Sequence, residues 1–353
     1  MNSRERFLAA ARRRPPDRVP VAPYMGNFGA VQAGVPLGRY NTDPVAMADA
    51  QTRAWEKLGQ DVVVAQSDQY YIAQGFGCVI EQPADATPHL VRTPYASLEE
   101  ACAARLKVVD PNKDGRMAVY LEAIRLLRRR FGGELAVRGP GTGPFSLASY
   151  LYGTQDFLMD IATAEADQDG DRRRRLLELM DYSSDCLIAF LKAVIEAGAD
   201  VAQAGDSLAS LDMISPAIYE AYVWPFEKKV FDAVNPLAHA RGAVSLLHIC
   251  GDTRLILPRM AETGADVLEI DHKVSLAEAR RLVGGRTALM GNLDPSGLLL
   301  QGSPAEVEAA ARAAMRAGGG IEGGFILGSG CEVPPKAPLE NLRAMVKAAG
   351  EFG

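Results

Sequence analysis

The chain has few cysteines and no excess of positive charge. Five cysteines among 353 residues, an odd number without dense spacing, do not indicate a disulfide framework. The 38 lysines and arginines are outnumbered by 44 acidic residues, which leaves a net charge of −6. Nonspecific nucleic-acid binding needs clustered positive charge, so we expect no nucleic-acid partner. Two short arginine runs, 128–130 and 172–175, lie in helical patterns. They are interpreted as solvated helix faces, with a docking patch for a partner as the alternative.

Long apolar runs are also missing. None reaches the roughly 18 residues that a membrane helix needs. The first six residues are polar and lead into a short amphipathic stretch, which is not how a signal peptide begins. We therefore expect a cytoplasmic protein without a membrane partner. In a reducing compartment, clustered cysteines more often indicate metal binding or catalysis than disulfides.

Apolar, β-branched segments recur along the whole chain, separated by helical patterns. Such continuous runs are typical of strands buried on both faces. Strand followed by helix, repeated eight times, predicts an α/β fold, the (β/α)8 TIM barrel, with an N-terminal helical extension. No linker or repeat divides the chain, so we expect one domain over residues 1–353. The predicted strands are 19–25, 61–67, 135–139, 200–204, 243–250, 266–271, 287–292 and 324–331.

One histidine and two cysteines lie where two of these strands end. His248 and Cys250 end the fifth strand, and Cys331 ends the eighth. Side chains two residues apart on a strand point to the same face, and the active sites of this fold lie at the carboxyl ends of the strands. One imidazole and two thiols suit Zn²⁺ and leave a fourth position for water, a carboxylate or substrate. The alternative is a hydrogen-bonded core histidine and two small buried cysteines.

Further polar residues follow the same strands. Asp206 begins the loop after the fourth strand, where it either caps a turn or contacts substrate. Asn292 ends the seventh strand, and His272 follows the sixth beside Asp271, which suggests a supporting role near the site. The glycine-rich segment 139–144 lacks the signatures of phosphate-binding loops and is interpreted as a rigid loop that shapes the cavity.

Several motifs resemble those of the uroporphyrinogen decarboxylase superfamily. The opening, Arg-Glu-Arg-Phe at 4–7 and Pro-Asp-Arg-Val-Pro at 16–20, is common to the superfamily. The segment Leu-His-Ile-Cys-Gly at 247–251 and the later Gly330-Cys331 look like its zinc branch, which holds the methylcobamide:coenzyme M methyltransferases and their bacterial relatives. The segments 290–293 and 337–342 fit the same branch, and the resemblance covers nearly the whole chain.

The resemblance implies a ligand set for the metal. The zinc ligands of the family match His248, Cys250 and Cys331. An acidic residue on the following strand closes the metal site in the family, and spacing places Asp271 there, with Glu269 as the fallback. The decarboxylase branch is disfavoured because its arginine-rich segment after the first strand has no counterpart in residues 24–29.

The resemblance also implies a reaction and a partner. A methylated corrinoid (methylcobamide), carried by a separate small corrinoid-binding protein, would give its methyl group to an acceptor, either a thiol such as coenzyme M or tetrahydrofolate. Zinc would hold an acceptor thiol as the thiolate. Asp206 and Asn292 are candidate catalytic residues that orient substrate or meet the corrinoid, and Asp68 or Asp206 would protonate a pterin acceptor. The alternatives are a decarboxylase-like lyase and a non-catalytic zinc module that docks a corrinoid protein.

Overall fold

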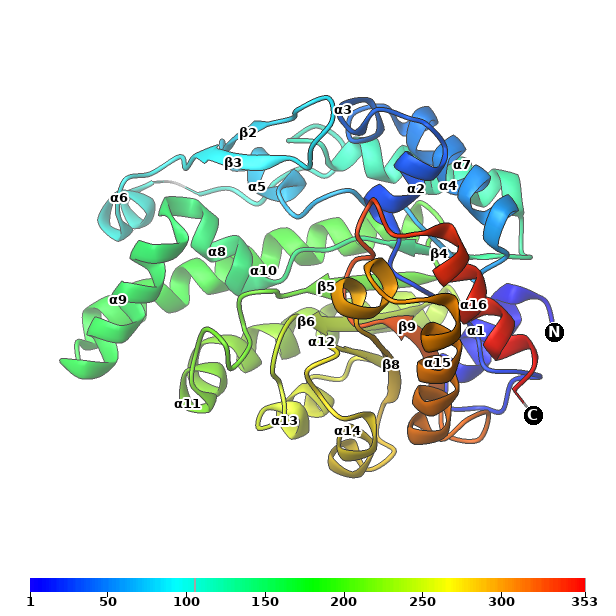
Figure 1. Ribbon diagram of the computed structural model, residues 1–353. Helices are drawn as coiled ribbons and strands as arrows, with labels where there is room; N and C mark the ends of the chain where they lie inside the picture. Colours follow the sequence, from blue (N-terminus) through cyan, green and yellow to red (C-terminus); the bar gives the residue numbers. More distant parts are fainter. Residues whose placement is uncertain (105, 353) are drawn as a thin grey trace.

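The core of the protein is a curled sheet of seven parallel strands (Figure 1). In the computed structural model, which describes residues 1–104 and 106–352, each strand pairs in parallel with the next strand of the sheet. Helices connect the strands, as an α/β barrel requires. In sheet order the strands are β1 (Val62–Val64), β4 (Ala136–Gly139), β5 (Val201–Gly205), β6 (Val244–Ile249), β7 (Val267–Ile270), β8 (Ala288–Leu293) and β9 (Phe325–Ser329).

The first predicted strand, 19–25, is present only as a single parallel bridge between Val21 and Leu327. The Leu327 amide donates to Pro20 O (2.9 Å), and the Asp61 amide, next to β1, donates to Val21 O (2.8 Å). This segment thus connects the two edges of the sheet and closes the TIM barrel, which confirms the predicted fold class. The bridge stays short because Pro20 and Pro23 have no amide hydrogen to donate to a longer ladder.

The N-terminal extension is helix α1 (Ser3–Ala11), and it covers the amino-terminal end of the barrel. A capping box between Asn2 and Glu5 begins this helix. Its buried side chains, Phe7 and Leu8 among them, form a cluster with residues that point into the barrel from the strands. That end of the barrel is therefore closed, and the site must lie at the other end.

The outer layer consists of helices that pack against the sheet and against one another. Ser97, Ser275 and Ser303 each cap the start of a helix, since each hydroxyl accepts a hydrogen bond from the amide three residues later. Within the described residues, no helix combines the length and the apolar character needed to cross a membrane. The outer helices are α2 (Gly26–Gln32), α3 (Leu37–Tyr40), α4 (Pro44–Leu58), α7 (Met117–Phe131), α8 (Pro144–Tyr152), α9 (Thr154–Ala166), α10 (Gly170–Glu196), α11 (Pro216–Ile218), η1 (Tyr219–Val223), α12 (Trp224–Ala240), α13 (Leu257–Glu262), α14 (Leu276–Val283), η2 (Pro295–Leu300), α15 (Pro304–Gly318) and α16 (Leu339–Gly350).

The connection between β1 and β4 carries an insertion whose two strands lie outside the eight predicted ones. It contains α5 (Tyr71–Gly75), a two-stranded antiparallel sheet of β2 (Val79–Glu81) and β3 (His89–Arg92), and α6 (Leu98–Ala103). Figure 1 shows β2 and β3 separate from the barrel sheet, above it in this view. The loop that joins them brings Thr87 to the cavity described below. The insertion therefore builds part of one cavity wall.

Candidate active site

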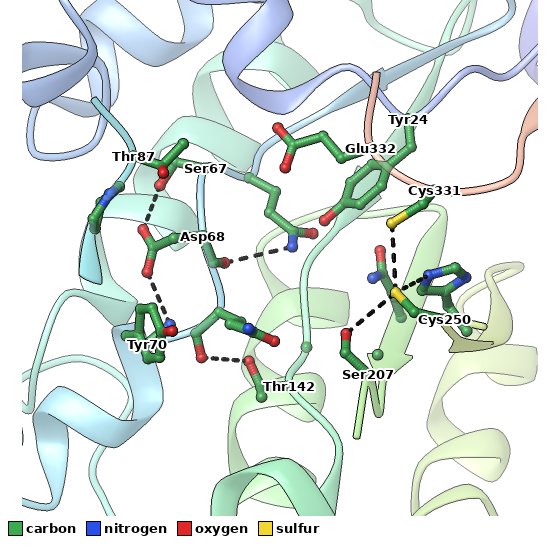
Figure 2. A pocket seen from close by; sticks show the side chains of 17 residues that line it. Tyr24, Ser67, Asp68, Tyr70, Thr87, Thr142, Ser207, Cys250, Cys331 and Glu332 are labelled. Atoms are coloured by element: carbon green, nitrogen blue, oxygen red, sulfur yellow. Dashed lines mark hydrogen bonds between the residues drawn. The ribbon is translucent and has the colours of Figure 1, made fainter. Parts of the chain in front are cut away.

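His248, Cys250 and Cys331 converge at the carboxyl ends of β6 and β9 (Figure 2). Their ligand atoms all lie within 4.8 Å of one another. The distance from His248 Nε2 to Cys250 Sγ is 3.1 Å, and the two sulfur atoms are 3.4 Å apart as free thiols. The period of two on β6 turns both of its side chains to the barrel interior. The sequence-predicted triad is thus assembled by the fold.

A buried ion pair fixes the orientation of the His248 ring. His248 Nδ1 lies 3.3 Å from the Glu269 carboxylate, which leaves Nε2 turned toward the cysteines. Glu269 in turn accepts two hydrogen bonds from Arg138, at 2.8 and 2.6 Å. The Arg138 guanidinium also lies 4.5 Å from the centre of the Tyr24 ring. This arrangement makes Glu269 the partner of the far ring nitrogen, the usual support of a metal-binding histidine, rather than a member of the ligand group.

The charges of the three side chains are coupled. Burial lowers the pKa of His248, but the Glu269 carboxylate and the bond to Cys331 outweigh it and raise that pKa to about 9. The hydrogen bond from Cys331 lowers the pKa of Cys250, and the same bond raises the pKa of Cys331. Hence one sulfur carries negative charge readily, as a metal ligand must.

The donor set fits a zinc ion. One imidazole nitrogen and two sulfurs are the ligand types that tetrahedral zinc prefers, and two thiolates on one zinc lie about 3.8 Å apart. The observed sulfur separation of 3.4 Å is close to that value. Ser207 supports the same group, since its hydroxyl oxygen lies 3.5 Å from Cys250 Sγ and this contact also lowers the pKa of Cys250.

Asp271 lies outside this convergent group. Its Oδ2 accepts from the Gly251 amide (2.8 Å), and its Oδ1 accepts from the Lys273 amide (3.0 Å) and lies 2.9 Å from His272 Nδ1. Asp271 therefore fixes the turn that follows Cys250. Its assignment as fourth ligand stays a prediction, as does the supporting role of His272.

Asp206 and Asn292 hold neighbouring loops in place. The buried Asp206 carboxylate accepts hydrogen bonds from the Phe145 amide (2.9 Å) and from the amide and hydroxyl of Ser146 (both 2.7 Å). It thus caps the start of α8, and burial raises its pKa to about 6. Asn292 donates to the carbonyls of Asp271 (3.1 Å) and Val274 (2.6 Å). Neither side chain lines the cavity, and their catalytic roles stay predictions.

A cavity of about 400 Å³ opens beside the triad, and Figure 2 shows its lining. The triad lies on one side, and residues that follow β1 form the opposite side. The period of two identified the triad, whereas most of the opposite side lay outside any motif. The lining residues are Tyr24, Gln66, Ser67, Asp68, Gln69, Tyr70, Thr87, Pro88, Gly141, Thr142, Gln203, Gly205, Ser207, His248, Cys250, Cys331 and Glu332.

Asp68 on the opposite side is fully hydrogen bonded. Arg116 donates to both of its oxygens, at 2.8 and 2.9 Å. The hydroxyls of Ser67 and Tyr120 and the amide of Tyr70 complete the set. Although burial raises the pKa of Asp68, the bonds to Arg116 outweigh it and lower that pKa. Asp68 is therefore an anion with no proton to give.

Glu332 is bonded through one oxygen only. Its Oε1 accepts from the amide (2.9 Å) and side-chain nitrogen (3.0 Å) of Asn27. Burial raises the pKa of Glu332 to about 7. The sequence placed Glu332 beside Cys331 at the end of the eighth strand, but only the structure shows that it lines the cavity.

Comparison with known proteins agrees with this geometry. The family model described as uroporphyrinogen decarboxylase (URO-D) matches residues 2–352, so the chain belongs to that family. A methylcobamide:CoM methyltransferase of Methanosarcina mazei is 31% identical over 99% of this chain and 98% of its own length. A methylcobamide:CoM methyltransferase of Methanosarcina barkeri is 30% identical over 98% of this chain and 97% of its own length. A uroporphyrinogen decarboxylase of Syntrophotalea carbinolica is 30% identical over 96% of this chain and 95% of its own length.

Solved structures give the same result. A methyltransferase from Methanosarcina mazei superposes with a TM-score of 0.87 at 29% identity and covers 100% of this chain and 99% of that one. A B12-independent methionine synthase from Shewanella, at 16% identity and a TM-score of 0.56 over 86% of this chain and 87% of its own, shares the fold. Taken with the full-length relatives, the first of these matches makes the chain a methyltransferase of the URO-D family.

Proposed function

We propose that the chain transfers a methyl group from a methylated corrinoid, carried by a separate corrinoid protein, to a small thiol. The observation that carries this proposal is the convergence of His248, Cys250 and Cys331 on one wall of the cavity. The full-length relatives that bear the name methylcobamide:CoM methyltransferase support it.

His248, Cys250 and Cys331 are the residues that would hold Zn²⁺. When bound there, zinc would lower the pKa of an acceptor thiol and keep it as a nucleophilic thiolate. Asp271 is proposed for the fourth position in the absence of substrate. Zinc-edge X-ray absorption on wild type, Asp271→Ala and Glu269→Ala tests this assignment. Loss of an oxygen ligand in Asp271→Ala supports it, and an unchanged first shell in that variant refutes it.

The chain's own residues orient the reactants. Glu269 and Arg138 fix the His248 ring, and Ser207 steadies Cys250. The cavity of about 400 Å³ has room for a small thiol beside the triad. In the reaction a sulfur–carbon bond forms and the carbon–cobalt bond breaks. Its electron pair stays on cobalt, giving Co(I), and the thiol proton leaves to solvent.

The lining argues against a decarboxylase acting on a polycarboxylate. Among the described residues around the cavity there is no lysine or arginine to bind substrate carboxylates. The nearest buried guanidinium groups, Arg116 and Arg138, are each already paired with a carboxylate of the protein. For a tetrahydrofolate acceptor, Asp68 would not be the proton donor, because its bonds to Arg116 hold it as an anion. Glu332 lines the cavity with a pKa raised by burial to about 7, and it would have to serve instead. The imidazole and two thiols at the cavity wall favour a thiol acceptor, because they are the ligands of a zinc ion that would activate it.

An acceptor panel tests the proposal. Methylcobalamin, as a substitute for the corrinoid protein, is mixed with the zinc-loaded protein and either a small thiol or tetrahydrofolate. We expect the cobalt spectrum to change from the methylated to the demethylated form with a thiol and not with tetrahydrofolate. If no acceptor demethylates methylcobalamin, the proposal fails in favour of a module that docks a corrinoid protein without turnover. Release of CO₂ from a tetrapyrrole would instead support the lyase.

A further inference from the structure

We infer that the methyl acceptor is a small aminothiol whose ammonium group pairs with Glu332. This inference rests on the proposed thiol methyl transfer and narrows its acceptor. The relatives named above carry CoM, an acceptor that differs in charge, in their printed names. Three features of the cavity support an aminothiol instead. No lysine or arginine lines it, Glu332 does line it, and the carboxylate of Asp68 is already fully hydrogen bonded to the protein.

Apart from the metal group itself, the described lining of the cavity offers no lysine or arginine to neutralise an anionic acceptor. Arg116 donates to both oxygens of Asp68, and the buried Arg138 donates to both oxygens of Glu269 and, through Nε, to Gln203 at 2.7 Å. A sulfonate or carboxylate at the end of the acceptor away from the metal would therefore find no free guanidinium or ammonium group, and desolvating an unpaired charge is costly.

Glu332 is the carboxylate with capacity to bind a ligand. Its backbone follows Cys331 directly, and its side chain lines the same cavity as the two sulfurs. Asn27 anchors Oε1 through two hydrogen bonds. Gly26 permits this close approach, because a Cβ at that position would lie 2.8 Å from Oε1. In the part of the chain that the structure describes, Oε2 has no hydrogen-bond partner, and Figure 2 shows the side chain among those that line the cavity.

The other carboxylate that lines the cavity, Asp68, does not compete for the ammonium group. Arg116 balances its charge, and hydroxyl and amide donors fill both of its oxygens. When ionised, Glu332 is thus the lining carboxylate whose charge no lysine or arginine of the protein balances. An ammonium group bonded to Glu332 Oε2 makes a charge-assisted hydrogen bond, whereas a sulfonate in the same place meets a like charge.

Three two-carbon thiols that differ only in the group at the other end test the inference. They are cysteamine, 2-mercaptoethanol and 2-mercaptoethanesulfonate, each used to demethylate methylcobalamin with zinc-loaded wild type and with Glu332→Gln. The ratio between the two proteins cancels the different intrinsic reactivities of the thiols. We expect Glu332→Gln to lower kcat/KM about tenfold for cysteamine, the effect of one charge-assisted hydrogen bond. The substitution should leave kcat/KM for 2-mercaptoethanol unchanged and raise kcat/KM for 2-mercaptoethanesulfonate.

The matched control is Glu340→Gln, which makes the same chemical change on an exposed helix face where Glu340 pairs with Arg343. It should alter none of the three rates. The inference is overturned if kcat/KM of wild type is higher for 2-mercaptoethanesulfonate than for cysteamine. It is also overturned if Glu332→Gln lowers kcat/KM equally for all three thiols.

Calorimetric binding of cysteamine and 2-mercaptoethanesulfonate to the zinc-loaded protein separates this inference from the proposed function. Tighter binding of cysteamine, weakened in Glu332→Gln, supports the inference even if no thiol turns over. Equal binding of the two refutes it. Absence of turnover with every thiol refutes methyl transfer itself.

Discussion

The two sides of the cavity use charge differently. On the β1 side, Asp68 is enclosed by Arg116 and three further residues, so every lone pair that faces the protein is used. On the β6 and β9 side, Cys250 and Cys331 bond mainly to each other and to His248, and Glu332 is anchored through one oxygen. The first side is complete without a ligand, whereas the second retains donor atoms for one.

This difference indicates which polar residues hold the structure and which carry chemistry. A buried charge that is fully paired fixes a loop and is costly to disturb. A group of sulfur and nitrogen atoms that point at a common centre has capacity for a cation. Asp206 resembles Asp68 in this respect, since its oxygens accept hydrogen bonds from the start of α8, and its catalytic role stays a prediction.

The largest effect is expected on zinc content, from Cys331→Ala on the β6 and β9 side of the cavity. Wild type should contain about one zinc per chain, and the variant should lose nearly all of it, because only two protein ligands remain. Metal analysis of the purified proteins measures this. Cys102→Ala is the control, since Cys102 is half-buried away from the cavity and should not affect zinc. Equal zinc in Cys331→Ala and wild type, or none in wild type, would remove the metal site.

Asp68→Asn should affect stability and spare the metal. The substitution leaves Arg116 buried without its counterion, which costs about 3–5 kcal/mol of unfolding free energy. Urea unfolding measures that loss, and metal analysis should still find the zinc of wild type. If Asp68→Asn unfolds at the same urea concentration as wild type but loses zinc, then the β1 side serves metal binding rather than stability, and the account is contradicted.

Asp206→Asn should remove a pH dependence of stability. Burial raises the pKa of Asp206 in the folded state from 3.8 to about 6. A raised carboxyl pKa favours folding below pH 4, and this contribution is lost as the pH rises through 6. The stability of wild type relative to Asp206→Asn should therefore fall by about 3 kcal/mol between pH 4 and pH 7. Urea unfolding over this range tests it, and a constant difference would contradict it.

Ser207→Ala should have the smallest effect. The hydroxyl lies 3.5 Å from Cys250 Sγ, a long contact to one of three ligands. We expect zinc to be retained and methyl transfer to fall only a few-fold, since a support residue of this kind contributes less than a ligand. Rates with methylcobalamin and 2-mercaptoethanol measure this. A loss as large as that of Cys331→Ala would show that Ser207 is part of the reactive group.

The sequence predicted the barrel and the triad because both follow local rules. Alternation on β6 orients His248 and Cys250 together, and the strand-end position of Cys331 brings it to the same rim. The sequence could not predict which carboxylate meets which partner. Asp206 caps a helix that begins about 60 residues earlier in the chain, and Glu269 pairs with Arg138 across 131 residues. Such pairings depend on the closure of the barrel and leave no local pattern.

The most direct test of the central claim is methyl transfer by protein stripped of metal and then reloaded with zinc. Methylcobalamin and 2-mercaptoethanol serve as donor and acceptor, and the cobalt spectrum reports demethylation. The account predicts that the stripped protein is inactive, that about one zinc per chain restores wild type, and that zinc does not restore Cys331→Ala. Full activity of the stripped protein, or equal activity of Cys331→Ala, would contradict the claim that His248, Cys250 and Cys331 hold the metal that activates the thiol.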